Sequence, residues 1–311
     1  MPWRRLGSRT TPPSPDRSRT LATGLLVLLT AVWGSTFFLI RDLVTTVPPV
    51  DFLAIRFGIA AVLMVVLFWR SLRALGRREW VAGLGLGALY GLAQILQTIG
   101  LAHTDASVSG FITGTYVVLT PVLSAILLRE RVPASTWYAV LLSTAGLAVL
   151  SLRGVSIGVG EVLTLGCAAV YALHIIGLGR LSTPSHATGM AAVQMIAIAL
   201  LCLVVAVPDG VVWPQGGGQW AAVLYMATAA GVLAIWVQTW AQAHMSATRA
   251  AVVMTLEPVF AALFAVAFGS ESPTGRMLVG GALVVAAMYL VELRGRRADD
   301  QSVEVLHHEV T

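Results

Sequence analysis

The feature that most constrains this chain is a succession of apolar segments, each close to the length that crosses a lipid bilayer as a helix. Such a helix needs about 20 consecutive, mainly apolar residues. Strands of a membrane barrel would alternate polar and apolar residues over about ten positions, whereas these runs are continuously apolar. We identify ten of them, separated by proline, glycine or charged residues, at 21–40, 51–69, 80–100, 107–128, 135–152, 160–178, 188–207, 219–241, 251–269 and 274–292.

The composition supports the same interpretation. Hydrophobic residues make up 57% of the 311 residues and charged residues only 11%, with a mean hydropathy of +0.82. Soluble domains carry roughly 25% charged residues, so we exclude a soluble enzyme, a nucleic-acid-binding protein and a disulfide-stabilised scaffold. Cys167 and Cys202 lie inside apolar segments, which indicates free thiols. The polar ends, 1–19 and 295–311, are predicted to be disordered tails. The predicted fold class is an all-α membrane protein.

The arginines predict an orientation in the membrane. All 20 basic residues are arginine. With the N-terminus in the cytoplasm, 16 of them fall on the cytoplasmic side, which leaves Arg41, Arg153 and Arg276 outside and Arg56 within a span. Cytoplasmic loops of membrane proteins carry such an excess of basic residues. We therefore predict a multi-pass protein of the plasma (inner) membrane with both termini cytoplasmic. The same asymmetry explains the pI near 9.8 without any nucleic acid.

An internal repeat is the sharpest signal in the sequence. Gln97-Thr98 and Ala102-His103 recur as Gln238-Thr239 and Ala243-His244, at a constant offset of 141 in the numbering. Ala31-Val32-Trp33-Gly34 is matched by Ala169-Val170-Tyr171-Ala172 at an offset of 138, and Pro121-Val122 by Pro258-Val259 at an offset of 137. Glu130 and Glu271 return to the offset of 141. The order of these matches indicates two related halves, 20–152 and 158–294.

Each half contains five predicted spans, and an odd number of spans reverses the direction of the chain. The second half is therefore expected to lie upside down relative to the first. The predicted architecture is ten transmembrane helices arranged as two inverted five-helix repeats. Inverted repeats are typical of secondary transporters, which bind substrate near the bilayer midplane between the halves and alternate access by rocking.

At these residues the chain resembles the drug/metabolite transporter superfamily, in particular its EamA-type ten-helix permeases. The resemblance covers about 20–295 and rests on short motifs in a fixed order: Trp33-Gly34-Ser35, Pro49 with Arg56, Ala102 to Ser107, Pro121 with Glu130-Arg131, Gly160-Glu161-Val162-Leu163, and Glu257-Pro258 with Glu271. The chain departs from the family pattern in the first half, where the glutamate follows the proline at an interval of 9, against 13 in the second half.

What the resemblance implies is a permease that exports or exchanges small metabolites such as amino acids or drug-like compounds. The expected partners are a small-molecule substrate and the lipid bilayer, with no nucleic acid and no cofactor. Proton coupling and a homodimer stay open. A sugar-phosphate or nucleotide-sugar antiporter of the same superfamily would need several cations in its cavity, and only Arg56 is buried. A membrane receptor or a membrane-embedded enzyme is a weaker alternative, and the sequence contains no Gly-x-Ser-x-Gly pattern.

Ionisable residues inside spans are candidates for function, because each costs about 2.5–3.5 kcal/mol to insert. Arg56 can hold a substrate carboxylate through its planar fork; the alternative is a structural arginine bonded to loop carbonyls, to Asp51 or to Asp105. Glu257 precedes Pro258, which frees carbonyls beside a cavity, so it can exchange a proton or bind an amine. His174 is expected at a similar depth, as a proton relay with Glu257 or as a satisfied core histidine.

Polar side chains on the third segment form a second candidate. Tyr90, Gln94 and Gln97 share one helical face, which overlaps the face of Gly83, Gly87 and Gly91. Glycines at this spacing permit close contact between helices. The polar residues therefore either line the pathway or bond across a tight helix interface. Further candidates for the substrate pathway, each with ordinary packing as its alternative, are Trp33, Ser35, Thr36, Tyr116 and Gln238. We predict no metal site and no catalytic residue.

Overall fold

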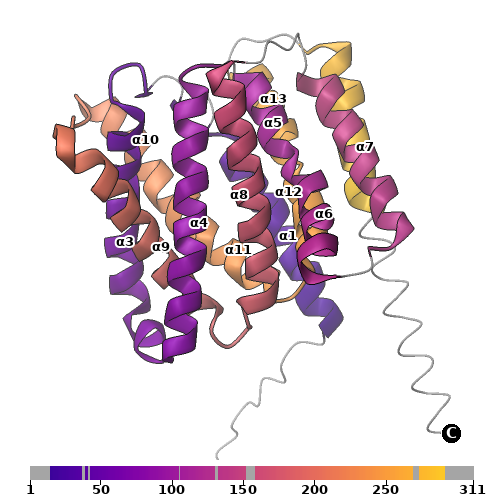
Figure 1. Cartoon of the computed structure of the whole chain (residues 1–311). Coiled ribbons are helices and arrows are strands. Elements are labelled where there is room, and N and C mark those ends of the chain that lie inside the picture. Colours follow the sequence, from indigo (N-terminus) through magenta and orange to yellow (C-terminus); the bar gives the residue numbers. More distant parts are fainter. Residues whose placement is uncertain are drawn as a thin grey trace, which may run out of the picture.

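The computed structural model describes residues 15–36, 39–40, 43–104, 106–129, 132–151, 158–268 and 273–290. Within these ranges the regular structure is entirely helical, and the helices pack side by side in one bundle (Figure 1). The terminal tails, Asp105, Glu130-Arg131 and Glu271 lie outside the described residues, as do the predictions that involve them. Residues 15–19, which we predicted to be part of the N-terminal tail, instead form the first turns of α1 (Pro15–Gly34).

Six helical stretches are long and apolar enough to cross a membrane. Four are single helices: α3 (Pro49–Arg73), α4 (Arg77–Leu101), α8 (Val159–Leu181) and α9 (Ala187–Ala206). The other two stretches, Gly217–Gln242 and Ala247–Phe264, are composite. Four shorter apolar helices are Ser18–Gly34, Ile112–Leu128, Thr136–Val149 within α7 (Ala134–Ser151), and Gly275–Leu290. These helices coincide broadly with the predicted segments, and the number that crosses the bilayer stays a prediction.

Several predicted segments are not continuous α-helices, and the first of them, 21–40, leaves the α-helix after Gly34. The segment 107–128 is divided at Thr115 into α5 (Ala106–Gly114) and α6 (Tyr116–Leu128). The segment 251–269 begins earlier and is divided into α12 (Ala247–Met254) and α13 (Glu257–Phe268). Pro258 has no amide hydrogen to bond the carbonyl of Met254, so α12 cannot continue through it. Thr115 and Thr255 each turn their hydroxyls back onto a carbonyl three positions earlier.

The segment 219–241 contains a π-helix that we did not predict. α10 (Gly217–Ala227) runs into the π-helix Thr228–Leu233, which continues into α11 (Ala234–Gln242). A π-helix bonds i to i+5 and occurs mostly as a single-turn bulge, frequently at functional sites. Its carbonyls are not all used by the helix itself, so it presents acceptors to side chains from neighbouring helices.

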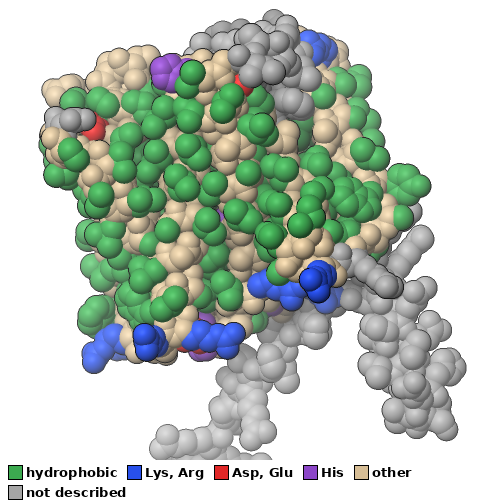
Figure 2. Space-filling model, viewed as in Figure 1, with side chains coloured by type: hydrophobic (Ala, Val, Ile, Leu, Met, Phe, Trp, Pro, Cys, Tyr) green, Lys and Arg blue, Asp and Glu red, His purple; other side chains and the backbone are tan. Residues whose placement is uncertain are grey.

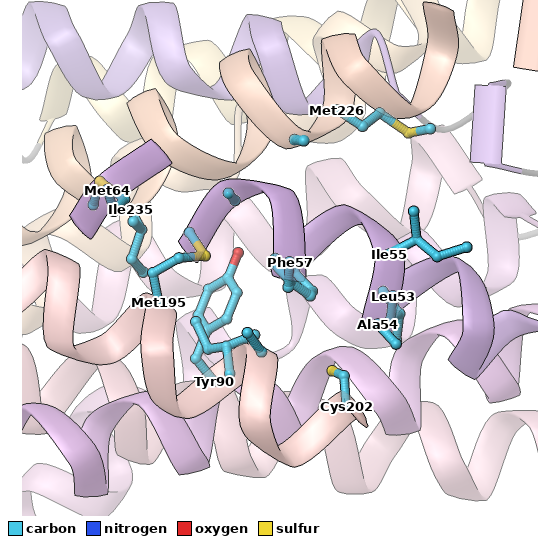
Figure 3. Packing of buried hydrophobic residues seen from close by; sticks show 14 of the residues in the cluster. Leu53, Ala54, Ile55, Phe57, Met64, Tyr90, Met195, Cys202, Met226 and Ile235 are labelled. Atoms are coloured by element: carbon cyan, nitrogen blue, oxygen red, sulfur yellow. The ribbon is translucent and has the colours of Figure 1, made fainter. Parts of the chain in front are cut away.

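Glycines set the closest helix crossings. A Cβ added to Gly83 would lie 2.8 Å from Val193 Cγ1 on α9, and one added to Gly34 would lie 2.8 Å from the Ala261 nitrogen on α13. Such contacts are typical of membrane helices, where small residues let backbones approach. Around the α3–α9 crossing lies the largest buried cluster, in which Phe57 of α3, Tyr90 of α4 and Met195 of α9 meet (Figure 3).

The outside of the bundle is sorted by polarity. Figure 2 shows hydrophobic side chains over most of the visible face, with basic side chains gathered along its lower edge. The loop between α3 and α4 lies at that edge in Figure 1 and is flanked by Arg70, Arg73, Arg77 and Arg78. We refer to this edge as the arginine-rich end. An apolar band limited by charged residues fits a bilayer environment.

Candidate functional site

A cavity of about 70 Å³ lies within the bundle. Its lining includes Leu101, the last residue of α4, and Ile40, which follows α1, so it extends toward the end opposite the arginines. Side chains from both halves of the chain contribute to it. The lining residues are Trp33, Thr36, Ile40, Arg56, Tyr90, Gln94, Gln97, Thr98, Leu101, Thr113, Tyr116, Tyr171, Ile175, Gln238, Met254 and Glu257.

All but two of the candidate residues named from the sequence line this one cavity. They come from α1 and the turn after it, α3, α4, α6, α11 and α13, which are far apart along the chain. The two exceptions are Ser35 and His174. Ser35 shares a hydrogen bond of 2.6 Å with the Tyr225 hydroxyl on α10. His174 lies fully buried behind the cavity, where its ring packs edge-on against Tyr90.

Arg56 is buried, with 3% of its surface exposed, and bonds to backbone carbonyls of the second half. Its Nε donates to the Met226 carbonyl at 3.2 Å, and Nη2 donates to the Ala230 carbonyl at 3.1 Å. The guanidinium carbon also lies 4.8 Å from the centre of the Phe57 ring. The alternative of bonding to loop carbonyls is thus corrected: the acceptors belong to α10 and the π-helix.

Of the two carboxylates that we considered as partners of Arg56, Asp105 lies outside the described residues and Asp51 is engaged elsewhere. Asp51 Oδ2 accepts a hydrogen bond from the Val212 amide at 3.0 Å. Within the described residues, Nη1 of Arg56 has no hydrogen bond. Because Arg56 lines the cavity, one nitrogen of a permanent cation is available there to an anionic ligand.

The π-helix joins three elements at this point. The Ala230 carbonyl accepts from Arg56 and, at 3.4 Å, from Nε1 of Trp33 on α1. In an α-helix this carbonyl would accept mainly from the amide four positions later. The unpredicted change of helix type therefore explains how one carbonyl can bind two side chains of the first half.

Glu257 opens α13 and lines the cavity together with the polar residues of α4. Its side chain makes no hydrogen bond or ion pair with any residue that the structure describes. A Cβ on Gly34 would lie 2.9 Å from the Glu257 carbonyl oxygen, so only a glycine lets α1 pass this close. The carboxyl group is therefore held at a helix break with its oxygens free for a solute or a proton.

The polar residues of α4 form a hydrogen-bonded network along the cavity wall. Gln94 donates to the hydroxyls of Tyr171 and, at 3.4 Å, Tyr90. Tyr171 donates to Gln97 Oε1 at 3.2 Å, and Gln97 donates to Thr113 at 3.3 Å. Meanwhile Gly83, Gly87 and Gly91 face α9. Adjacent parts of the α4 surface thus line the cavity and pack against α9, and the role of the polar residues in a substrate pathway stays a prediction.

Gln238 lines the cavity and has an acceptor atom without a partner among the described residues. Its Nε2 donates to Gln242 Oε1 at 3.2 Å and to the Met254 sulfur at 3.7 Å. Its Oε1 is buried and has no hydrogen-bond partner among the described residues. Tyr116 adds a buried aromatic wall, and Thr36 turns its hydroxyl onto the Trp33 carbonyl at 2.8 Å. The cavity therefore combines aromatic surface with a few convergent polar groups, the usual character of a small-molecule site.

His174 forms no hydrogen bond with Glu257. Its Nε2 shares a hydrogen bond of 2.9 Å with Gln194 Oε1 on α9, and its Nδ1 has no partner in the described part of the chain. The relay between His174 and Glu257 therefore stays a prediction. Across the residues that the structure describes, no group of three or more His, Cys, Asp or Glu side chains is arranged to hold a metal ion.

Tyr171 is the principal cavity residue that we did not select from the sequence. The signal was present, because Tyr171 matches Trp33 in the repeat and Trp33 was selected. Thr98 and Thr113 also line the cavity, but threonines in apolar helices are common and nothing in their spacing marks them.

Comparison with known proteins places the chain in a family. The model of the EamA-like transporter family matches it twice, over residues 21–152 and 158–293. The chain belongs to the EamA-like transporter family. An uncharacterized transporter of Archaeoglobus fulgidus is 33% identical over 270 residues, covering 86% of this chain and 85% of the relative. The pseudopaline exporter CntI of Pseudomonas aeruginosa is 28% identical over 273 residues, covering 84% and 93%.

A solved structure shares the EamA-like fold. It superposes with a TM-score of 0.72 and 22% sequence identity, covering 91% of this chain and 99% of the other. The chain is therefore a multi-pass membrane protein of a transporter family, and it contains two copies of the family domain. The cavity lies between residues of the two matched regions, with Arg56 and Gln97 from the first and Tyr171, Gln238 and Glu257 from the second.

Proposed function

We propose that this protein is a secondary transporter that moves small organic metabolites, such as amino acids or drug-like compounds, across the plasma membrane by alternating access. Its ten helices form two inverted five-helix repeats, with both termini in the cytoplasm. The observation that carries the proposal is that Arg56 and Glu257, from different halves, line one cavity and each keep a polar atom without a partner among the described residues. Isolated ionisable groups inside a membrane are costly and usually mark a substrate or ion pathway.

The chemistry of the cavity favours a solute with both polar and apolar parts. Arg56 suits a carboxylate, because its guanidinium makes charge-assisted hydrogen bonds. Glu257 and Gln238 Oε1 suit a donor such as an amine. Trp33, Tyr116 and Tyr171 supply aromatic surface for an apolar side group. These groups lie in one cavity, so one small molecule can contact several of them.

The size of the cavity supports a mechanism in which the helices move. At about 70 Å³, it is well below the roughly 300–1,000 Å³ of sites that hold drug-sized ligands. A metabolite therefore has to widen it, and the breaks at Thr115, Thr255 and the π-helix are places where helices can bend.

The phosphate-carrying alternative receives less support. Sugar phosphates and nucleotide sugars carry several negative charges, and among the described residues Arg56 is the one cation that lines the cavity. The names of the relatives, transporter and exporter, support carriage of a solute rather than its chemical conversion.

The test is flux through purified protein in liposomes. A thermal-shift screen of metabolites first selects ligands, because a ligand that binds the folded form raises its melting temperature. Pseudopaline belongs in the screen, because one relative is named for its export. We expect saturable uptake of at least one hit and none into empty liposomes. Hits that bind without flux would contradict the proposal and favour a receptor.

A further inference from the structure

The internal repeat pairs six cavity residues of the first half with polar residues of the second half. We call residues related by offsets of 138 or 141 repeat mates. By this rule Trp33, Thr36, Arg56, Gln97, Thr98 and Leu101 have the mates Tyr171, His174, Gln194, Gln238, Thr239 and Gln242. For one pair the helix boundaries agree with the rule: Arg56 and Gln194 each follow the first residue of their helix, Pro49 and Ala187, by seven positions.

The mates divide into two groups. Tyr171 and Gln238 line the cavity together with their counterparts. The others do not, and we call them the buried polar cluster, defined as His174, Gln194, Thr239 and Gln242. The first three have 0% of their surface exposed and Gln242 has 1%. All four lie toward the arginine-rich ends of α8, α9 and α11, away from the open part of the cavity.

Hydrogen bonds connect most of this cluster. His174 bonds to Gln194, and Gln194 Nε2 donates to the Thr239 hydroxyl at 3.0 Å. Gln242 accepts from Gln238 at the cavity and donates to the Ile175 carbonyl at 2.9 Å. One polar atom of the cluster makes no hydrogen bond: His174 Nδ1 is fully buried and has no partner among the described residues. A buried nitrogen without a hydrogen bond destabilises the fold, so this atom is a candidate for binding a ligand in another conformation.

We propose that the buried polar cluster is the second face of the substrate site and lines the pathway in the opposite conformation, in which the arginine-rich end is open. This inference rests on the proposed transport function. Inverted halves exchange their conformations during alternating access. In the opposite conformation the pathway would be lined by the mates of the residues that line the cavity in this structure. His174 and Gln194 would then occupy the positions relative to the pathway that Thr36 and Arg56 occupy in this structure.

The packing around the cluster shows what has to separate. Leu178 lies one turn beyond His174 on α8, and Met190 lies one turn before Gln194 on α9. Both are fully buried and belong to one apolar contact cluster. They lie between the pair His174 and Gln194 and the arginine-rich end. Movement of α8 relative to α9 at this contact would expose the free nitrogen of His174 to a solute with a hydrogen-bond donor or to water.

The test is cysteine accessibility in the full chain with Cys167 and Cys202 replaced by alanine. Thr36→Cys reports the present cavity, and His174→Cys and Thr239→Cys report the cluster. Ala191→Cys is the matched control: it is fully buried on α9, and its mate Leu53 does not line the cavity. A membrane-impermeant methanethiosulfonate is applied to right-side-out and inverted vesicles.

We expect Thr36→Cys to react from the face opposite the arginines and the two cluster variants to react from the arginine-rich face only. A minor conformation is typically populated at roughly 0.1–10%. The cluster cysteines should therefore be modified at about that fraction of the rate of a fully exposed cysteine. Thr239→Cys, the milder change, decides the result if His174→Cys fails to fold.

If both cluster variants resemble Ala191→Cys, or react from the wrong face, in protein that still transports solute, the inference is overturned and the proposed function stands. Absence of solute flux in the liposome assay would instead overturn the proposed function.

Discussion

Arg56 has two tasks at the level of the single residue. Two of its nitrogens bond to carbonyls of α10 and the π-helix, which ties α3 to the second half. The third nitrogen is left for the cavity. A lysine carries the same charge on a single nitrogen and cannot reproduce this planar fork. A substitution of Arg56 should therefore change both the stability of the protein and the binding of a solute, and the two effects can be measured separately.

For Arg56→Lys we expect a loss of stability of about 1–3 kcal/mol, from the carbonyl acceptors left unsatisfied. We also expect roughly 10- to 100-fold weaker transport of a carboxylate-bearing solute, which corresponds to one lost hydrogen bond to a charged group. Thermal melting and liposome flux measure the two effects. Asp51→Asn, on the same helix and outside the cavity, serves as the control. Unchanged flux in Arg56→Lys would remove the arginine from the site.

We propose that Glu257 couples transport to protons. Proton uptake from an acidic exterior neutralises its carboxylate and releases a bound amine to that side, so export should rise as the exterior becomes more acidic. The other titratable groups lining the cavity are Arg56, Tyr90, Tyr116 and Tyr171, all of which keep their protons at neutral pH in water. The carboxyl group is thus the member of this set suited to exchange.

We expect Glu257→Gln to retain flux down a solute gradient but to lose its response to a pH gradient, because an amide does not take up the proton. Flux in liposomes with and without an imposed pH difference measures this. Glu161→Gln, at the first turn of α8 and outside the cavity, should behave as the unmodified protein. An equal pH response in Glu257→Gln would exclude the coupling role.

Among the elements, α4 shows how one helix combines close packing with a polar wall. At Gly87 an added Cβ would collide with the backbone of Gln194 on α9, whereas at Gly85 it would meet nothing within 4 Å. Gly87→Leu should therefore push α4 from α9 and cost about 1–3 kcal/mol as an overpacked contact. Gly85→Leu is the control on the same helix. Melting temperatures compare the two, and equal values would contradict the crossing.

Much of the architecture was predictable, and the limits have physical causes. The length of the apolar runs located the helical segments, because a helix needs about 20 mainly apolar residues to cross the hydrocarbon core of a bilayer. Arg56 and Glu257 could be selected because ionisable residues are rare inside spans, and Gln97 because it shares a helical face with Tyr90 and Gln94. That the three line one cavity came only from the structure. The break at Thr255 has a cause that the sequence shows, Pro258. The break at Thr115 and the π-helix were not predictable, because the same apolar residues suit either helix type and packing decides between them.

For the whole molecule, the side of the membrane on which each terminus of the chain lies decides whether the two halves can be inverted repeats. In the proposed arrangement, two halves of five spans each would place both termini on one side of the membrane, and the arginine-rich end predicts that this side is the cytoplasm. Reporter domains joined to the N- and C-terminus in turn should both be active only in the cytoplasm. Reporters on opposite sides would mean an odd number of spans and would exclude the inverted arrangement.

The π-helix also determines where this chain tolerates shortening. Bonds from i to i+5 make the turn Thr228–Leu233 hold about one residue more than an α-helical turn, much as an insertion would. Removing Ala229 should let α10 and α11 join as one regular helix with their flanking faces still in phase. A deletion within α4 would instead rotate its downstream half by about 100°. The shortened protein should fold yet lose transport, because the carbonyls that hold Arg56 and Trp33 would be drawn back into the helix.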